Sequence, residues 1–305
     1  MGEMRINMKK TVTFLVILLT LMCLTACKTK EESPTKEASF RVEDYQQLED
    51  IISIEEIKED GSTAVSTYSI RYQSDDCEVV AYLSVPQSCL DEKTPYPCII
   101  YNRGGNREYG ANEKEAIVAM AESSNKIIFA SQYRGVGGGT GKDEFGGSDL
   151  QDVLKLVDFC EEFSFVDMSH LYMMGMSRGG MMTYMAVRED SRIKKAVVVS
   201  GVADSFMLYE ERDDMKQVYK ELVGATPKEK SEEYKKRSAT YWAGEINCPV
   251  LIIHSKKDEK VSFAQAKKMV QCLKEVGKDY EFVTYEDNVH GLHPEDFEII
   301  MKWCQ

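Results

Sequence analysis

Several chemical signatures are missing from this chain of 305 residues. No two cysteines form a C-x-x-C pair, so the spacing gives no indication of a zinc site, and we expect neither a metal nor an organic cofactor. No long basic patch is present, and 51 acidic residues against 38 basic ones give a net charge of −13. Because a nucleic-acid-binding surface has to be basic, we expect no nucleic-acid partner.

The sequence also lacks a phosphate-binding loop and an apolar run long enough for a comfortable membrane span. The glycine-rich stretch 135–142 is not a phosphate-binding loop, because Val136 stands where that motif needs glycine and Asp143 where it needs serine or threonine. The apolar run 11–25 has only fifteen residues, whereas a comfortable membrane span needs ~20.

That run instead has the pattern of a signal peptide, with basic residues before it and a small residue after it. The segment Leu24-Thr25-Ala26-Cys27 resembles the lipobox of bacterial lipoproteins. The resemblance implies cleavage before Cys27 and a diacylglyceryl group on its sulfur. An uncleaved anchor or an ordinary secretory signal are the alternatives.

The sequence therefore predicts a signal peptide at 1–26, a lipidated polar tether at 27–44 and a catalytic domain at 45–305. The domain would be held on the extracytoplasmic side of the cell membrane without crossing it. Export permits disulfides, but the seven cysteines after Cys27 are odd in number and form no recognisable framework.

Strands and helices alternate along most of the remaining chain. Segments 64–72 and 78–85 predict an antiparallel hairpin, and Ser148 to Gln151 has the pattern of a capping box that opens a helix. The later strands are apolar without clean alternation, which is typical of a parallel sheet covered on both faces. We expect an α/β fold with a mixed sheet. The charged segment 203–246 is expected to be helical, either as a solvated helix pair or as a small cap over the site.

The most informative motif is Gly-Met-Ser-Arg-Gly-Gly at 175–180, directly after an apolar strand. It fits G-x-S-x-G, in which a sharp strand-to-helix turn exposes a nucleophilic serine. Asp258 and His290 follow in loops after later strands, and Ser, Asp, His is the chain order of an α/β-hydrolase triad. We therefore predict Ser177 as nucleophile, His290 as base and Asp258 as the acid that orients the imidazole.

Alternatives remain for two of these residues. His293 is the second candidate for the base, whereas His254 and His170 fit structural roles better. Asp279 and Asp287 are weaker candidates for the acid. The oxyanion needs preorganised N–H donors, which we expect from the Arg178 backbone and from the glycine-rich loop 102–106.

With these motifs, the chain resembles the catalytic domain of the prolyl oligopeptidase family of serine peptidases. The resemblance rests on Tyr133-Arg134-Gly135 with 145–153, on the motif at 175–180, on 237–239 with 249–261, and on Asn288-Val289-His290-Gly291. It implies an α/β-hydrolase fold, the same triad, and an oxyanion hole made by Gly105 and the Arg178 amide. The candidate substrate-pocket residues are Arg103, Phe206 and Tyr209.

We therefore expect a serine hydrolase that cleaves short peptides through an acyl-enzyme. A carboxylesterase or deacetylase of the same fold is the alternative. A non-catalytic lipoprotein that binds a ligand in a retained hydrolase pocket is the hypothesis from another class.

Overall fold

The computed structural model describes residues 38–57 and 64–305. The predicted signal peptide and most of the predicted tether, including Cys27, lie outside the described residues. None of the described helices is long and apolar enough to cross a membrane.

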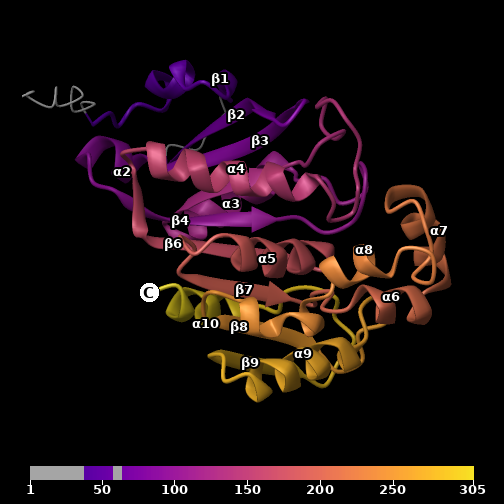
Figure 1. Ribbon diagram of the computed structural model, residues 1–305. Coiled ribbons are helices and arrows are strands. Elements are labelled where there is room, and N and C mark those ends of the chain that lie inside the picture. The colour runs from indigo at the N-terminus through magenta and orange to yellow at the C-terminus, as the bar shows by residue number, and fades with distance from the viewer. Residues whose placement is uncertain (1–37, 58–63) are drawn as a thin grey trace, which may run out of the picture. The chain divides into compact units, whose positions relative to one another are not determined.

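A nine-stranded sheet forms the centre of the domain, in the order β1-β2-β3-β5-β4-β6-β7-β8-β9 (Figure 1). The first three strands pair antiparallel, and β3 also pairs antiparallel with β5, whereas the strands from β5 to β9 in this order are parallel. The strands are β1 (Ile51–Glu56), β2 (Val65–Ser74), β3 (Cys77–Pro86), β4 (Tyr96–Asn102), β5 (Ile127–Ser131), β6 (Val166–Met176), β7 (Lys195–Val199), β8 (Val250–Ser255) and β9 (Tyr280–Tyr285).

Helices cover both faces of this sheet, which explains why its strands are almost continuously apolar. One face packs against α4 (Asp149–Glu162), α5 (Arg178–Glu189) and α9 (Phe263–Glu275). The other packs against α3 (Lys114–Ser124) and α10 (Asp296–Trp303). Neighbouring residues of one strand, such as Met173 and Met174, belong to opposite cores. The predicted mixed α/β architecture is confirmed.

The segment 203–246 is helical, as expected. It contains α6 (Ser205–Glu211), α7 (Asp213–Leu222), α8 (Ser231–Lys236) and the short 3-10 turns η2 (Ala239–Tyr241) and η3 (Ala243–Glu245). In Figure 1, α6 and α7 project beyond the end of the sheet. This segment follows β7, so it leaves the sheet at the carboxyl end of a parallel strand, where open α/β sheets bind their ligands.

Some local features differ from the sequence-based expectations. The edge strand β1, the short helix α2 (Gln87–Glu92) and the 3-10 turn η1 (Val42–Gln47) were not predicted. The compact unit begins at Ser39, and Val42 is fully buried, so packing starts before the expected boundary at 45. Val42 and Tyr45 fall on one side of η1, and Tyr45 packs edge-on against Phe163.

The capping box at Ser148 is wrong, although α4 does begin at the next residue. Ser148 has helical backbone angles and makes no side-chain cap, whereas a capping residue needs an extended backbone to turn its hydroxyl back onto the helix. Its amide instead donates to Glu144, and the Asp149 carboxylate accepts from the Gly146 amide.

The glycines of the serine motif allow β6 and α5 to pack closely. A Cβ built on Gly179 would lie 1.9 Å from the backbone oxygen of Asn102 on β4, and one on Gly175 would lie 2.0 Å from the oxygen of Gly179. No side chain fits at such distances, so the turn between strand and helix depends on glycine at both positions.

We expect Gly179→Ala to lower the free energy of unfolding by at least ~3 kcal/mol, because the new methyl group overlaps backbone that cannot move aside. Urea denaturation followed by circular dichroism measures this. Gly244→Ala is the matched control, since its nearest contact would be an ordinary 3.9 Å. Equal stability of the two variants would contradict the packing argument.

Candidate active site

Ser177 lies at the tip of the turn between β6 and α5. Its backbone has φ 57° and ψ −120°, a region that serine enters only when its surroundings impose it. The surroundings do so here through two hydrogen bonds: the Ser177 amide donates to Val199, and the Ser177 carbonyl accepts from Val202. This is the strained strand-to-helix turn that the motif predicts.

His290 and Asp258 are joined although 32 positions separate them. His290 lies in the loop between β9 and α10, and its Nδ1 is 2.8 Å from Oδ2 of Asp258, which follows β8. The other carboxylate oxygen accepts from the amides of Lys260 and Val261 at 2.8 and 3.1 Å. With Nδ1 donating to Asp258, Nε2 is left with a lone pair that can accept a proton.

The electrostatics favour an ionised Asp258. Burial by itself would raise the pKa of this carboxyl group, but the hydrogen bonds from His290 and from the Val261 amide hold its pKa below the usual value. An anion at this place can stabilise an imidazolium at His290.

The alternative residues are engaged elsewhere. His293 Nε2 lies 2.9 Å from the carboxylate of Asp287, and its ring stacks on Tyr285. His254 is buried behind the acid: its Nε2 donates to the Val261 carbonyl and lies 3.6 Å from the Asp258 carboxylate, and burial lowers its pKa. His170 pairs with Asp167, in the first half of β6. Asp279 precedes β9, at the opposite end of that strand from the His290 loop.

Ser177 and His290 line one pocket of about 620 Å³, a size within the range of small-molecule sites. No hydrogen bond between the Ser177 hydroxyl and His290 is present among the described residues. Such contacts are often long without substrate and tighten when it binds. The cap residues that line the pocket are the apolar Leu208, Met215 and Val218 and the charged Arg212 and Asp214, which form an ion pair with each other.

Of the three expected substrate-pocket residues, one lines the pocket and two do not. Arg103 lines the pocket, but its guanidinium is bound to backbone carbonyls. Phe206 and Tyr209 do not line it, and their rings pack against Tyr234 inside the cap. They lie one helical turn apart on α6, so they share a face, and Leu208 on another face reaches the pocket instead. The sequence could have shown this only with the orientation of α6 known.

Gly105 and Arg178, expected to supply the oxyanion hole, both line the pocket beside Ser177. A Cβ built on Gly104 would lie 3.3 Å from the Ser177 Cβ, so the glycine loop passes directly against the serine. No described residue accepts a hydrogen bond from the amide of Gly105 or of Arg178, which leaves both donors open to a ligand.

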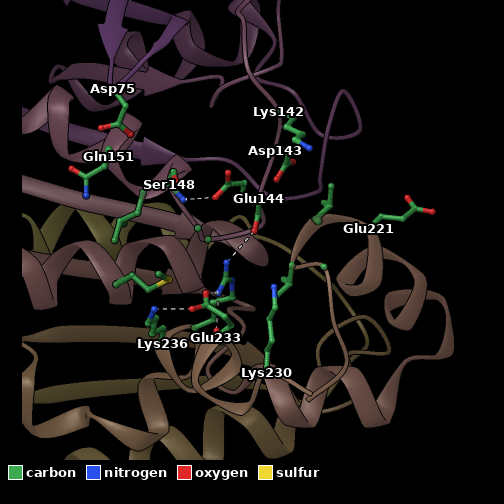
Figure 2. A pocket seen from close by; sticks show the side chains of 18 of the residues that line it. Asp75, Lys142, Asp143, Glu144, Ser148, Gln151, Glu221, Lys230, Glu233 and Lys236 are labelled. Carbon is green, nitrogen blue, oxygen red and sulfur yellow. Dashed lines mark hydrogen bonds and ion pairs between the residues drawn. The ribbon is translucent and has the colours of Figure 1, made fainter. Parts of the chain in front are cut away.

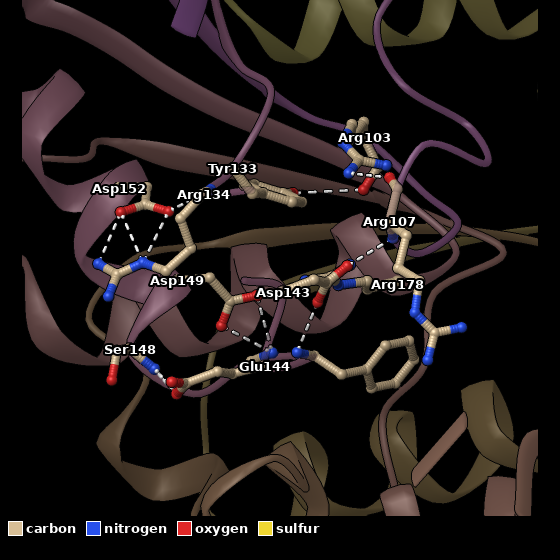
Figure 3. Close-up of polar contacts among 12 residues, drawn as sticks. Arg103, Arg107, Tyr133, Arg134, Asp143, Glu144, Ser148, Asp149, Asp152 and Arg178 are labelled. Carbon is tan, nitrogen blue, oxygen red and sulfur yellow. Dashed lines mark hydrogen bonds and ion pairs between the residues drawn. The ribbon is translucent and has the colours of Figure 1, made fainter. Parts of the chain in front are cut away.

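The Arg178 side chain was not assigned a role from the sequence. It is buried and forms ion pairs with Asp143, at 2.6 Å, and with Asp149 (Figure 3). Burial by itself would lower the pKa of this guanidinium, but the charges of Asp149 and Asp143 raise the pKa well above its usual range. The ion pairs thereby connect the serine turn to the start of α4 and to the loop before it.

A second pocket of about 680 Å³ contains neither Ser177 nor His290 (Figure 2). Phe145 lines the first pocket, and its neighbours Glu144 and Gly146 line the second. Most of its wall is charged, and Glu233 there is paired with Lys236 and Arg237. No group of three or more His, Cys, Asp or Glu residues in the described part of the chain could hold a metal ion.

The fold and the site define a serine hydrolase of the α/β-hydrolase class. The chain belongs to the prolyl oligopeptidase family, whose model matches residues 101–303. It is 31% identical over 242 residues to "Uncharacterized peptidase YtmA" of Bacillus subtilis, covering 79% of this chain and 92% of that one. It is 24% identical to "Dipeptidyl-peptidase 5" of Porphyromonas endodontalis, over 67% of this chain but 31% of that protein.

Two kinds of enzyme appear among similar solved structures. An acylaminoacyl peptidase in complex with Z-Gly-Gly-Phe-chloromethyl ketone has a TM-score of 0.68 and 24% identity, covering 79% of this chain and 41% of that one. Acetyl xylan esterase 1 from Thermoanaerobacterium has a TM-score of 0.65 and 13% identity, covering 83% and 86%. At these identities the likeness concerns the fold.

The two histidines of the β9–α10 loop can be separated by mutation. We expect His290→Ala to lower kcat by at least ~10³-fold, as for other triad residues, because no other histidine of the described residues lines the pocket with Ser177. His293→Ala, its matched control, should keep at least about a tenth of the activity. Steady-state kinetics on any turned-over ester or amide measures both, and a reversed order would exchange the roles of His290 and His293.

Proposed function

We propose that the protein hydrolyses short peptides by acyl transfer, with Ser177 as nucleophile, His290 as general base and Asp258 as the orienting acid. The observation that carries this proposal is the 2.8 Å hydrogen bond between His290 and Asp258 at the pocket that also contains the strained Ser177. Membership of a peptidase family supports the choice of peptides.

The geometry supports a two-step mechanism. His290 Nε2 takes the Ser177 proton as the oxygen bonds to the substrate carbonyl carbon, and the amides of Gly105 and Arg178 stabilise the oxyanion. His290 then donates the proton to the leaving amine, and an acyl-enzyme remains. A water molecule, deprotonated by the same imidazole, attacks the acyl group and releases Ser177.

The pocket also suggests which peptides fit. Leu208, Met215 and Val218 of the cap, together with Val202, form an apolar wall near Ser177. Burial of an apolar side chain there contributes roughly 1.5–3 kcal/mol. We therefore propose a preference for apolar residues on the acyl side of the cleaved bond.

A carboxylesterase is the second candidate, because the same chemistry cleaves esters and the fold is shared with acetyl xylan esterases. A panel of aminoacyl arylamides and short acyl esters separates the two. Amide turnover supports the peptidase, whereas ester turnover without amide turnover rejects it. Failure to react with a fluorophosphonate probe would instead favour a ligand-binding lipoprotein without catalysis.

We expect Ser177→Ala to lose at least ~10³-fold in rate and all fluorophosphonate labelling, with little change in melting temperature because only one oxygen is removed. Near-full activity of this variant would refute the nucleophile. Ser200→Ala is a suitable control, since Ser200 is buried at the end of β7 and does not line the pocket.

We further propose that the protein is a lipoprotein, cleaved before Cys27 and anchored to the extracytoplasmic side of the membrane through that residue. The basic, apolar and lipobox-like segments of the N-terminus support this. With such an anchor, the length of the polar tether would limit how far the candidate active site can lie from the membrane surface.

The anchor can be tested with two neighbouring cysteines. We expect wild type and Cys23→Ser to partition into the detergent phase of Triton X-114, because Cys23 belongs to the segment that is removed. Cys27→Ser should remain in the aqueous phase or retain residues 1–26. Mass spectrometry of the N-terminal peptide reports the lipid, and an unmodified Cys27 in the wild type would contradict the proposal.

A further inference from the structure

The two carbonyls on either side of the Gly105 Cα are each held by a buried arginine. Nη1 of Arg103 donates to the Gly104 carbonyl at 3.1 Å, and Nη1 of Arg178 donates to the Gly105 carbonyl at 3.3 Å. Gly105 has φ +67°, and a Cβ there would lie 2.0 Å from the Tyr109 oxygen. The residue expected to donate to the oxyanion is therefore fixed from both sides.

Arg103 itself is held without a described carboxylate partner. It is 1% exposed, and besides Gly104 its guanidinium donates to the carbonyls of Gln132, Tyr109 and Arg107 at 2.9, 3.3 and 2.7 Å. A buried cation whose hydrogen-bond acceptors are all neutral carbonyls is costly. All four carbonyls belong to the loops around the serine. The contacts of Arg103 therefore fix the conformation of these loops.

The two arginines also share an aromatic neighbour. Tyr133 lies within cation–π distance of both guanidiniums, 5.0 Å from that of Arg103 and 4.8 Å from that of Arg178. The Tyr133 hydroxyl donates to the Arg103 carbonyl (Figure 3). Asp143 completes the arrangement, because its Oδ2 accepts from Arg178 and from the Arg107 amide, both at 2.6 Å.

A held carbonyl determines where the next amide points. The peptide group is planar and trans, so its N–H points away from its C=O. When Arg103 binds the Gly104 carbonyl, the Gly105 N–H is turned to the opposite side, where no described residue accepts from it. A charged donor on the carbonyl also polarises the amide and strengthens its N–H as a donor. Donors that need no reorganisation during the reaction stabilise an oxyanion most effectively.

We propose that Arg103 and Arg178 are positioning residues of the oxyanion hole, which act by clamping the two peptide groups that flank Gly105. Arg103 fixes the peptide whose N–H meets the oxyanion, and Arg178 fixes the following one while its own backbone N–H supplies the second donor. This inference rests on the proposed function, and it replaces the expectation that the Arg103 side chain contacts substrate.

The test compares Arg103→Lys and Arg178→Lys with Arg134→Lys. Lysine keeps the positive charge but cannot span the carbonyls that a guanidinium reaches. Arg134 is a matched control, because it is also buried but binds Asp152 and Asp75, away from the serine. For each variant we would measure stability in urea, kcat and KM on the best substrate, and the Ki of a peptidyl trifluoromethyl ketone, which forms a tetrahedral adduct.

We expect kcat to fall ~10- to 100-fold in Arg103→Lys and Arg178→Lys, less than for outright loss of a donor. The ketone should lose affinity by the same factor while KM stays within about twofold, because only the tetrahedral state uses the hole. If the arginines had only a structural role, kcat would not fall selectively while KM stayed nearly constant. Arg134→Lys should lose stability, but it should not show a selective fall in kcat and ketone affinity at nearly constant KM.

Two results would overturn the inference. One is a folded Arg103→Lys enzyme with unchanged kcat and ketone affinity. The other is an Arg134→Lys enzyme in which kcat and ketone affinity fall by the same factor at nearly constant KM. If Arg103→Lys does not fold, Arg178→Lys decides, since its lysine can keep an ion pair with Asp143 or Asp149. Failure of the inference leaves Ser177-dependent hydrolysis and probe labelling intact, whereas failure of the proposed function removes both from the wild type.

Discussion

The buried guanidinium of Arg178 is the interaction on which the arrangement of the site depends. It begins α5 directly after Ser177 and is paired with Asp143 and Asp149, which belong to a loop and to the first turn of α4. A charge buried to this degree has to keep its partners, and loss of one partner of a buried pair costs about 3–5 kcal/mol. The serine turn, the start of α4 and the glycine loop are therefore stabilised together rather than separately.

The rest of the site is built at the same edge of the sheet. Strands β6, β7, β8 and β9 are parallel neighbours, so their carboxyl ends carry Ser177, the cap, Asp258 and His290 to one side. The cap supplies an apolar part of the wall through Leu208, Met215 and Val218, and it also supplies the paired charges of Arg212 and Asp214.

The serine motif could be predicted because it is a run of consecutive residues, and the order of the candidate triad because it is read directly along the chain. Gly175, Gly179 and Gly180 are required by close backbone approach, which at Gly179 is to Asn102 and at Gly180 to Gly201, and the strands around them are apolar because both sheet faces are covered. Edge strand β1 was missed because only one of its six residues is buried, so it has no strong hydrophobic pattern. The cap on Ser148 was wrong because the Glu144 and Asp149 carboxylates took over the contacts at the start of α4.

By itself, the sequence determined the fold class and the family and gave Ser177 as the candidate nucleophile, since each follows from motifs and spacing that can be read along the chain. The sequence ranked His290 and Asp258 first but left His293, Asp279 and Asp287 open, and only the tertiary structure showed that His290 pairs with Asp258 and His293 with Asp287. The tertiary structure alone also gave Arg103 and Arg178 their contacts. Those contacts join loops far apart in sequence, and the burial that makes them strong exists only after the sheet has brought the loops together.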